Sequence, residues 1–353
     1  MNSGISMIRH QYIDRESRQV CTERLYGDGI IRLMYSNIYE NAPFLFRILA
    51  GARLSKWLGY LNYETFIGEK ILGNGDFLKA CGIDGGECFE DTRRLDTLKK
   101  IFERKITYWN CRPMPNNPGA VVSPSDARMI YGSLSETSNL FIKGKFFDFE
   151  ELIGSDKRTW LSTFRDGDYA LFRLTPEKYH YNHTPVSGKI SDFYQIEGAY
   201  HSCNPHAVLT VAAPYSKNKR VVTIFDTDVP GGTSIGLVAM IEVVALMIGD
   251  IIQCHSKKRY DDPVSVGTGM FINRGLPKSL FRPGSSTVIL LFEKNRVRFA
   301  DDIVANMSSA GVESIFSNGF GKTLVETDVK VRSLIGSITR SSNELSGNAV
   351  YVQ

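Results

Sequence analysis

The spacing of apolar residues divides the chain into two parts. Before about residue 115, apolar positions recur at helical spacing in segment 44–61 (FLFRILAGARLSKWLGYL) and in segment 93–109 (RRLDTLKKIFERKITYW). Segment 93–109 is amphipathic and predicts a helix. Segment 44–61 is apolar over most of its circumference, with three cations scattered around it, and fits either a packed helix or one lying in a membrane interface.

After this point the pattern changes to short β-rich runs separated by Gly, Pro, Asn and Asp. Examples are segments 221–232 (VVTIFDTDVPGG) and 286–299 (STVILLFEKNRVRF). Prolines and paired asparagines at 113–119 disfavour a continuing helix and mark the boundary. The sequence therefore predicts an α+β protein, with an N-terminal helical, membrane-associating region (residues 1–115) followed by a mostly antiparallel β domain (residues 116–353).

The longest apolar stretch, residues 233–252, approaches the length of a membrane span. Glu242 near its centre and Asp250 at its end argue against that interpretation. Its Val, Ile, Met and Gly content predicts paired core strands instead, in which Glu242 is a buried carboxylate with polar partners.

Composition narrows the function classes. With 42 Lys+Arg against 38 Asp+Glu the net charge is +4, and no basic stripe suggests a nucleic-acid partner. Six cysteines without a C-x-x-C pair favour neither a zinc ribbon nor a disulfide framework. The N-terminus lacks the apolar core of a secretory signal peptide.

Several polar motifs have simple explanations. The glycine-rich segments 267–272 (GTGMFI) and 230–236 (PGGTSIG) lack the full pattern of a dinucleotide or phosphate loop and predict turns. His180, His183, His201 and His206 lack carboxylate partners at fixed spacing, so we expect no metal.

One constellation suggests chemistry. His180 and His183 lie three residues apart in an aromatic segment bounded by Pro and Gly, Asp126 lies in a predicted turn, and a Pro-Gly-Ser-Ser-Thr turn precedes an apolar strand at 286–292. A serine activated by a histidine that an aspartate orients is a common nucleophile at neutral pH. The sequence supplies the residue types but not their proximity.

Five segments, taken in order, resemble the phosphatidylserine decarboxylase family. They are 95–114, ending in Arg-Pro; 121–129 (VVSPSDARM); 142–154, with Lys-Gly; 172–190, with Tyr-His-x-x-His-x-Pro-x-x-Gly; and 281–293 (FRPGSSTVILLFE). The resemblance covers most of the chain. It implies a proenzyme that cuts itself near 285/286 into a large and a small subunit and converts the serine into a pyruvoyl group, its covalent cofactor.

The resemblance also implies roles for residues and partners. His183, oriented by Asp126, deprotonates Ser286, the pyruvoyl precursor, and His180 orients the substrate carboxylate or supplies a proton. The substrate amine forms a Schiff base with the pyruvoyl group, and phosphatidylserine becomes phosphatidylethanolamine and CO2. The expected assembly is a heterodimer of self-cleaved subunits, or a dimer of these, peripheral on the cytoplasmic face of a membrane.

Three departures from the family pattern leave alternatives open. Ser285 occupies the position of the family's glycine and is an alternative nucleophile, Ala127 replaces a glycine after Asp126, and segment 275–281 (GLPKSLF) departs from Gly-x-Glu-x-Gly-x-Phe. The alternatives are a pyruvoyl decarboxylase of a free aromatic amino acid and a non-catalytic lipid-binding relative. A serine hydrolase is disfavoured because no Gly-x-Ser-x-Gly motif occurs.

Overall fold

The computed structural model describes residues 9–23, 82–135, 146–210, 213–245, 250–283 and 286–339. In chain order its strands are β1 (Gln11–Asp14), β2 (Val20–Thr22), β3 (Ala120–Val122), β4 (Ala127–Ser133), β5 (Asp168–Leu174), β6 (Tyr181–His183), β7 (Gly188–Ile196), β8 (Arg220–Asp226), β9 (Leu237–Val243), β10 (Ile251–Gln253), β11 (Phe271–Ile272), β12 (Pro277–Phe281), β13 (Ser286–Phe292), β14 (Val297–Phe299), β15 (Glu326–Val329) and β16 (Leu334–Ile338). The α-helices are α7 (Leu98–Phe102), α8 (Tyr108–Cys111), α10 (Phe149–Ile153), α11 (Arg158–Phe164), α12 (Pro205–Thr210), α13 (Pro214–Lys217), α14 (Asp301–Met307) and α15 (Ile315–Phe320).

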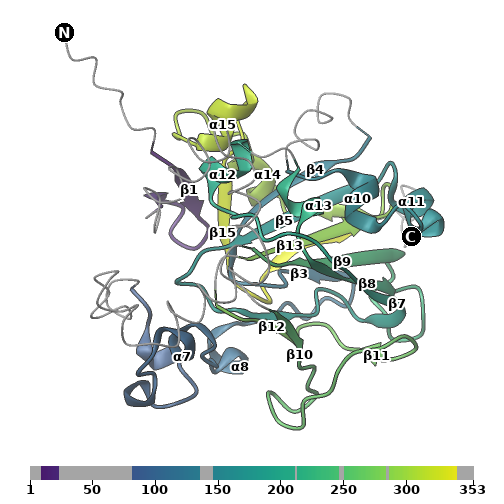
Figure 1. Cartoon of the computed structure of the whole chain (residues 1–353), viewed down its shortest axis with the longest axis horizontal. Coiled ribbons are helices and arrows are strands. Elements are labelled where there is room, and N and C mark those ends of the chain that lie inside the picture. The colour runs from purple at the N-terminus through teal and green to yellow at the C-terminus, as the bar shows by residue number, and fades with distance from the viewer. Residues whose placement is uncertain are drawn as a thin grey trace, which may run out of the picture.

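A ten-stranded sheet forms the centre of the fold, with the strand order β11-β7-β8-β9-β13-β5-β4-β15-β1-β2. All its pairings are antiparallel except the parallel pairing of β1 with β15. Two three-stranded sheets, β10-β12-β6 and β14-β16-β3, complete the β-structure. In Figure 1, β10 and β12 lie below β8, β9 and β13 of the large sheet, and α15 lies near the top of the molecule. The predicted mostly antiparallel β architecture is confirmed.

Strand β13 lies within the large sheet and is buried along its whole length. Its residues alternate between two apolar clusters: Ile289 and Leu291 pack on one face, and Val288 and Leu290 pack on the other. Neighbouring strands β5 and β9 hold β13 in a fixed register. The first residue of β13 is therefore placed by pairing on a rigid sheet.

The strands predicted within residues 233–252 are confirmed as β9 and β10. By contrast, the single helix predicted over segment 93–109 is wrong. The segment forms a 3-10 turn, α7 and α8, interrupted where Ile106 pairs with Cys88 in an isolated β-bridge. The reason is that a β-branched residue with extended partners overrides helical periodicity.

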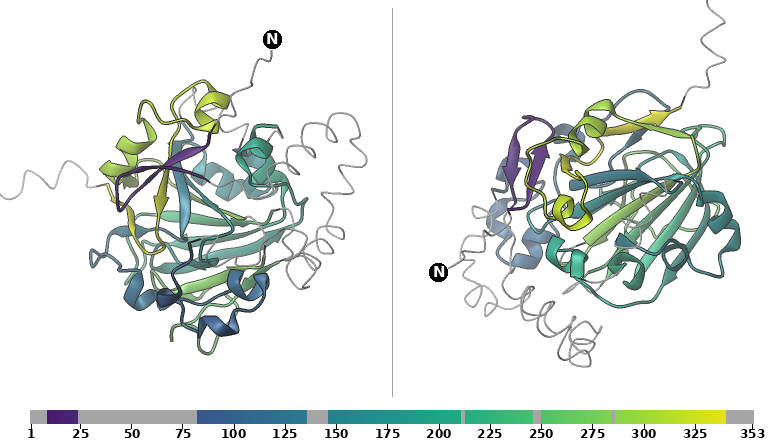
Figure 2. Two further views of the ribbon diagram at one scale, coloured as in Figure 1. Left: turned by 90° about the vertical axis from the view of Figure 1, so that its left-hand side faces the viewer. Right: turned by 90° about the horizontal axis from the view of Figure 1, so that it is seen from above.

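The helices of the described residues are spread along the chain, so a helical N-terminal region followed by a β domain is too simple a description. Strands β1 and β2, near the N-terminus, extend the large sheet, and Figure 2 shows this hairpin beside β15. The boundary at 115/116 stays a prediction, and segment 44–61 lies outside the described residues. None of the helices in the described part of the chain has the length and apolar character needed to span a bilayer.

Candidate active site

Ser286 begins β13, opposite Leu174 of β5. It is completely buried, and its hydroxyl oxygen has no hydrogen-bond partner among the described residues. A buried hydroxyl without a partner costs free energy. Such a position suits a nucleophile because nothing must be displaced before the oxygen attacks. Ser285 lies outside the described residues.

His183 ends β6 and is completely buried, with both ring nitrogens hydrogen-bonded. Its Nδ1 lies 2.9 Å from the carbonyl oxygen of Gly275, and its Nε2 lies 3.0 Å from the hydroxyl oxygen of Tyr179. A carbonyl can only accept, so Nδ1 carries the proton of the neutral ring. Nε2 therefore carries the basic lone pair, and in the neutral ring this lone pair accepts from the Tyr179 hydroxyl.

Gly275 can hold its carbonyl there because it is a glycine. Its φ of +77° falls in the left-handed region, and an added Cβ would lie 2.4 Å from the Met114 sulfur. Gly275 is the first residue of segment 275–281. Although this segment departs from the family pattern, it retains the glycine whose carbonyl fixes the His183 tautomer.

Asp126 lies just before β4 and does not hydrogen-bond His183. Its carboxylate oxygens accept two hydrogen bonds from Arg112, of 3.1 and 2.8 Å, and one of 2.7 Å from the backbone N–H of Val331. The two segments are nevertheless adjacent, because the His183 backbone N–H donates to the carbonyl of Pro124 over 2.8 Å. Asp126 thus acts on the ring of His183 through its charge, while Gly275 and Tyr179 orient it.

Burial controls the electrostatics of this site. Burial lowers the pKa of His183 to about 3, against the bond to Gly275 and the charge of Asp126, which raise it. Burial raises the pKa of Asp126, but the Arg112 charge and hydrogen bonds outweigh it and hold that pKa below its usual range. At neutral pH the site therefore contains a neutral imidazole near a carboxylate.

His180 differs from its neighbour. It is completely buried, and neither ring nitrogen has a hydrogen-bond partner among the described residues. Its ring stacks on Phe102 of α7, with the centroids 3.4 Å apart. Burial, followed by the charge of Arg104, lowers its pKa well below the usual value. Its backbone carbonyl binds Phe281 N–H at the end of β12, which connects this segment to the approach to Ser286.

A buried ion pair lies beside the strand that connects the two histidines. Glu242 of β9 and Lys278 of β12 are completely buried, with Nζ 2.6 Å from a carboxylate oxygen. Glu242 also accepts from Ser279 and from Asn182, which lies between the two histidines. The expectation that Glu242 is a carboxylate with polar partners is confirmed. Its partner Lys278 was not predicted, because β9 and β12 belong to different sheets and only their packing in the folded chain brings the two side chains together.

A cavity of about 500 Å³ reaches Asp126 and Tyr179. Its lining is strongly polar, with cationic side chains (Arg104, Arg112, Arg128, Lys178, Lys330) and carboxylates (Glu23, Asp84, Glu87, Asp126, Glu177, Asp328). A cavity with charges of both signs suits a small ligand that itself carries both.

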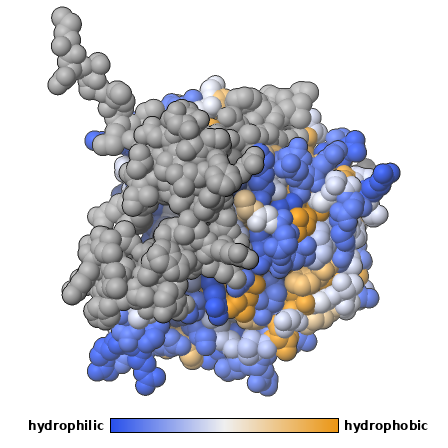
Figure 3. All heavy atoms as spheres, viewed as in Figure 1, coloured by the Kyte–Doolittle hydropathy of each residue, from blue (hydrophilic) through white to orange (hydrophobic). Residues whose placement is uncertain are grey.

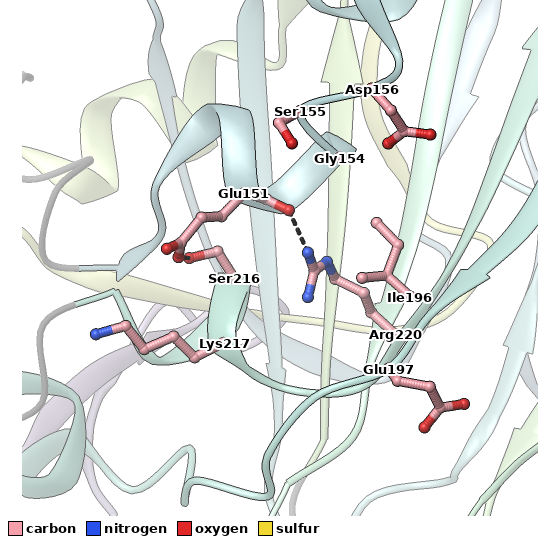
Figure 4. Close-up of a pocket in the computed structure, with 9 residues that line it drawn as sticks. All are labelled: Glu151, Gly154, Ser155, Asp156, Ile196, Glu197, Ser216, Lys217 and Arg220. Carbon is pink, nitrogen blue, oxygen red and sulfur yellow. Dashed lines mark hydrogen bonds between the residues drawn. The ribbon is translucent and has the colours of Figure 1, made fainter.

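A second cavity, of about 370 Å³, lies at α10 (Figure 4). There Arg220 of β8 donates to the carbonyl oxygens of Glu151 and Leu152, close to the end of α10. Arg220 pairs with Val243, and Val243 pairs with Thr287, so these side chains share one face of the sheet. Ser286 faces the other side, and this cavity is therefore separate from the candidate site.

One group of possible metal ligands occurs among the described residues, formed by His10, Glu23 and Glu326. The guanidinium of Arg173 lies between them, 2.5 Å from Glu23 and 2.6 Å from Glu326. An arginine in this position neutralises the carboxylates that a cation would need. We interpret the group as a buried ion-pair network that joins the β1–β2 hairpin to β5 and β15.

Comparison with known families gives a match over residues 98–316 to the model described as phosphatidylserine decarboxylase. The match includes Asp126, His180, His183 and Ser286, and runs from α7 into α15.

Individual relatives agree with the family match. The chain is 30% identical over 297 residues to a phosphatidylserine decarboxylase proenzyme of Fusobacterium nucleatum, covering 84% of this chain and 91% of that protein. It is 28% identical to proenzyme 3 of Schizosaccharomyces pombe, covering 92% of this chain but 30% of the longer yeast protein. A rice relative, proenzyme 2, is 31% identical over 66% of this chain and 36% of its own length.

Proposed function

The chain belongs to the phosphatidylserine decarboxylase family, and we propose that it decarboxylates phosphatidylserine to phosphatidylethanolamine after cutting itself at Ser286. The observation that supports this most directly is the hydroxyl of Ser286 at the start of a central strand, which is buried and has no hydrogen-bond partner among the residues that the structure describes. The word proenzyme in the names of the relatives agrees with a self-cleaving chain.

In the first reaction His183 acts as the base. Its neutral ring takes the proton of Ser286, whose oxygen attacks the carbonyl carbon of residue 285. The Ser286 nitrogen takes up the proton as the peptide bond becomes an ester. Elimination of the ester then leaves dehydroalanine, and hydrolysis releases ammonia and leaves a pyruvoyl group. The negative charge of Asp126 stabilises the protonated ring.

The residues around Ser286 fit a pyruvoyl group made in place, because β13 fixes the backbone of Ser286 and no described residue forms a hydrogen bond with its side-chain oxygen. The group supplies an electrophilic carbonyl for the substrate amine and holds the electrons released with CO2. His180, which is neutral and whose ring has no hydrogen-bond partner in the described ranges, orients the substrate carboxylate or delivers the proton that replaces CO2. The apolar surroundings of β13 exclude water.

We expect the protein to associate peripherally with the cytoplasmic face of a membrane, chiefly through segment 44–61. The coloured surface in Figure 3 is mainly hydrophilic, with apolar residues in scattered patches. Alkaline carbonate or high salt should strip much of the protein from membranes. Retention that only detergent overcomes would contradict a peripheral attachment.

Intact-mass analysis tests the cleavage site. The native protein should yield fragments 1–285 and 286–353, and the smaller should resist Edman sequencing because a pyruvoyl group has no free amine. Ser286→Ala should remain a single chain, whereas Ser285→Ala should cleave. The reverse pattern would make Ser285 the nucleophile, and an uncut native chain would refute the proposal.

A turnover assay tests the substrate. The cleaved protein should release CO2 from vesicles containing phosphatidylserine and not from free aromatic amino acids. Turnover of a free amino acid with inert vesicles would favour the soluble-substrate alternative.

A further inference from the structure

A chain of hydrogen-bonding groups leads away from His183. The hydroxyl oxygen of Tyr179 lies 3.0 Å from Nε2 of His183 and 2.8 Å from the hydroxyl oxygen of Tyr260. The Tyr260 oxygen in turn lies 2.8 Å from the carbonyl oxygen of Ile106, whose N–H donates to it over 3.2 Å. Tyr179 lies just before β6, Tyr260 in the loop after β10 and Ile106 between α7 and α8, so tertiary structure alone brings these groups together.

When His183 is neutral, this series of hydrogen-bonding groups has fewer protons than contacts. Burial, first of all, raises the pKa of both tyrosines, so each hydroxyl keeps its one proton at neutral pH. With His183 neutral, Tyr179 must donate to Nε2. Two protons, one from each tyrosine, are then shared among three contacts: His183 to Tyr179, Tyr179 to Tyr260, and Tyr260 to the Ile106 carbonyl. One contact therefore has no proton.

Protonation of His183 removes the imbalance. A ring that carries hydrogen on Nε2 donates to Tyr179, which turns its own hydrogen toward Tyr260, which donates to the carbonyl of Ile106. All three contacts then have a proton, and the Tyr260 oxygen still accepts from the Ile106 N–H. The Nδ1 bond to Gly275 is unchanged in both states.

We propose that Tyr179 and Tyr260 are positioning residues that form a reversible hydrogen-bond relay, which stabilises His183 when it holds the proton of Ser286. The inference rests on the proposed role of His183 as the base for self-cleavage. The Nε2 lone pair must be free to take the Ser286 proton, so Tyr179 first turns its hydrogen from Nε2 toward Tyr260, which turns its own hydrogen toward the carbonyl of Ile106. No proton leaves the site, because both hydroxyls rotate back when the ring gives its proton to the Ser286 nitrogen. In a buried site, such a pre-placed acceptor replaces the water that would otherwise stabilise an imidazolium.

The relay predicts a graded effect on the cleavage rate. Tyr179→Phe removes the acceptor of a charged donor and should slow cleavage about tenfold to hundredfold. Tyr260→Phe leaves the Tyr179 oxygen to accept from His183 but removes the oxygen to which the Tyr179 hydroxyl donates. It should slow cleavage about threefold to tenfold. Full-length chain made by cell-free synthesis and sampled over time gives the rates.

The double variant separates a relay from ordinary packing. Because Tyr260 acts on His183 only through Tyr179, Tyr260→Phe should have no further effect in a Tyr179→Phe background. Equal slowing in both backgrounds would overturn the relay. Tyr181→Phe is the matched control: its ring stacks on Tyr179 with centroids 5.5 Å apart, but no hydrogen bond joins its hydroxyl to the described residues. It should cleave at the native rate.

The same variants distinguish the relay from the base assignment. If His183→Ala cleaves normally, the proposed role of His183 fails and the relay with it. If His183→Ala is blocked while Tyr179→Phe cleaves at the native rate, only the relay fails. Nitrogen NMR of His183 in the uncleaved Ser286→Ala chain gives a second readout, in which Tyr179→Phe should shift the Nε2 resonance and Tyr181→Phe should not. An unchanged Nε2 resonance in Tyr179→Phe would also overturn the relay.

Discussion

His180 and His183 lie three residues apart and are equally buried, yet their surroundings are opposite. Both nitrogens of His183 have partners, which fix one tautomer and one ring orientation. Neither nitrogen of His180 has a partner in the described part of the chain, and its ring stacks on Phe102. A histidine with a fixed tautomer suits a proton acceptor that works within the folded chain. An unpaired histidine suits a reaction in which the partner arrives later, with the substrate.

The largest expected effect tests whether His183, and not His180, is needed for self-cleavage. His183→Ala and Asp126→Ala should both leave an uncleaved chain, slowed at least about a hundredfold, because one removes the base and the other its stabilising charge. His180→Ala should cleave. Intact mass after fixed times distinguishes these outcomes, and normal cleavage by both histidine variants would refute the division of roles.

A second expected effect is a loss of folding stability at acid pH. The pKa of His183 is about 3 in the folded chain and about 6.5 when unfolded. Between these two values His183 is protonated in the unfolded chain but neutral in the folded chain. The resulting loss of stability is absent above pH 6.5, grows as the pH falls, and approaches roughly 5 kcal/mol near pH 3. His180 acts in the same direction, because burial lowers its pKa too.

Urea unfolding of the uncleaved Ser286→Ala chain at several pH values measures this loss. Adding His183→Gln should reduce the dependence on pH, because a glutamine binds no proton in either state. An identical dependence with and without His183 would contradict the assignment of a depressed pKa to this residue.

The next effect appears only after cleavage. His180→Ala should form both subunits and the pyruvoyl group, yet release CO2 from phosphatidylserine vesicles about a hundredfold more slowly, as expected for loss of a proton donor or of a group that orients the substrate. Subunit formation on a gel serves as the internal control. Native turnover by the cleaved variant would leave His180 a structural residue.

The contrast between the two histidines could not have been predicted from the sequence. Local patterns correctly gave strands such as β8 and β13 and the choice of strands over a membrane span at 233–252. The motif order gave the family. The sequence did not show that Arg112 holds the carboxylate of Asp126, because an ion pair between segments depends on how α8 packs against the turn before β4. Tyr179 was within the quoted motif, but its role depends on Tyr260, 81 residues away along the chain.

The smallest expected effect compares the two histidines by the free energy of unfolding alone. In the uncleaved Ser286→Ala chain, His180→Phe keeps a flat ring on Phe102 and removes two buried nitrogens to which no described residue bonds, so the free energy of unfolding should rise by about 1 kcal/mol. His183→Phe instead leaves the buried Gly275 carbonyl without its donor, while Tyr179 can still donate to Tyr260, and should lower the free energy of unfolding by about 1 to 3 kcal/mol. Urea midpoints with unchanged slopes give both values. If His180→Phe were the more destabilising substitution, the ring nitrogens of His180 would have partners in solution, and the argument that its partner arrives with the substrate would lose its basis.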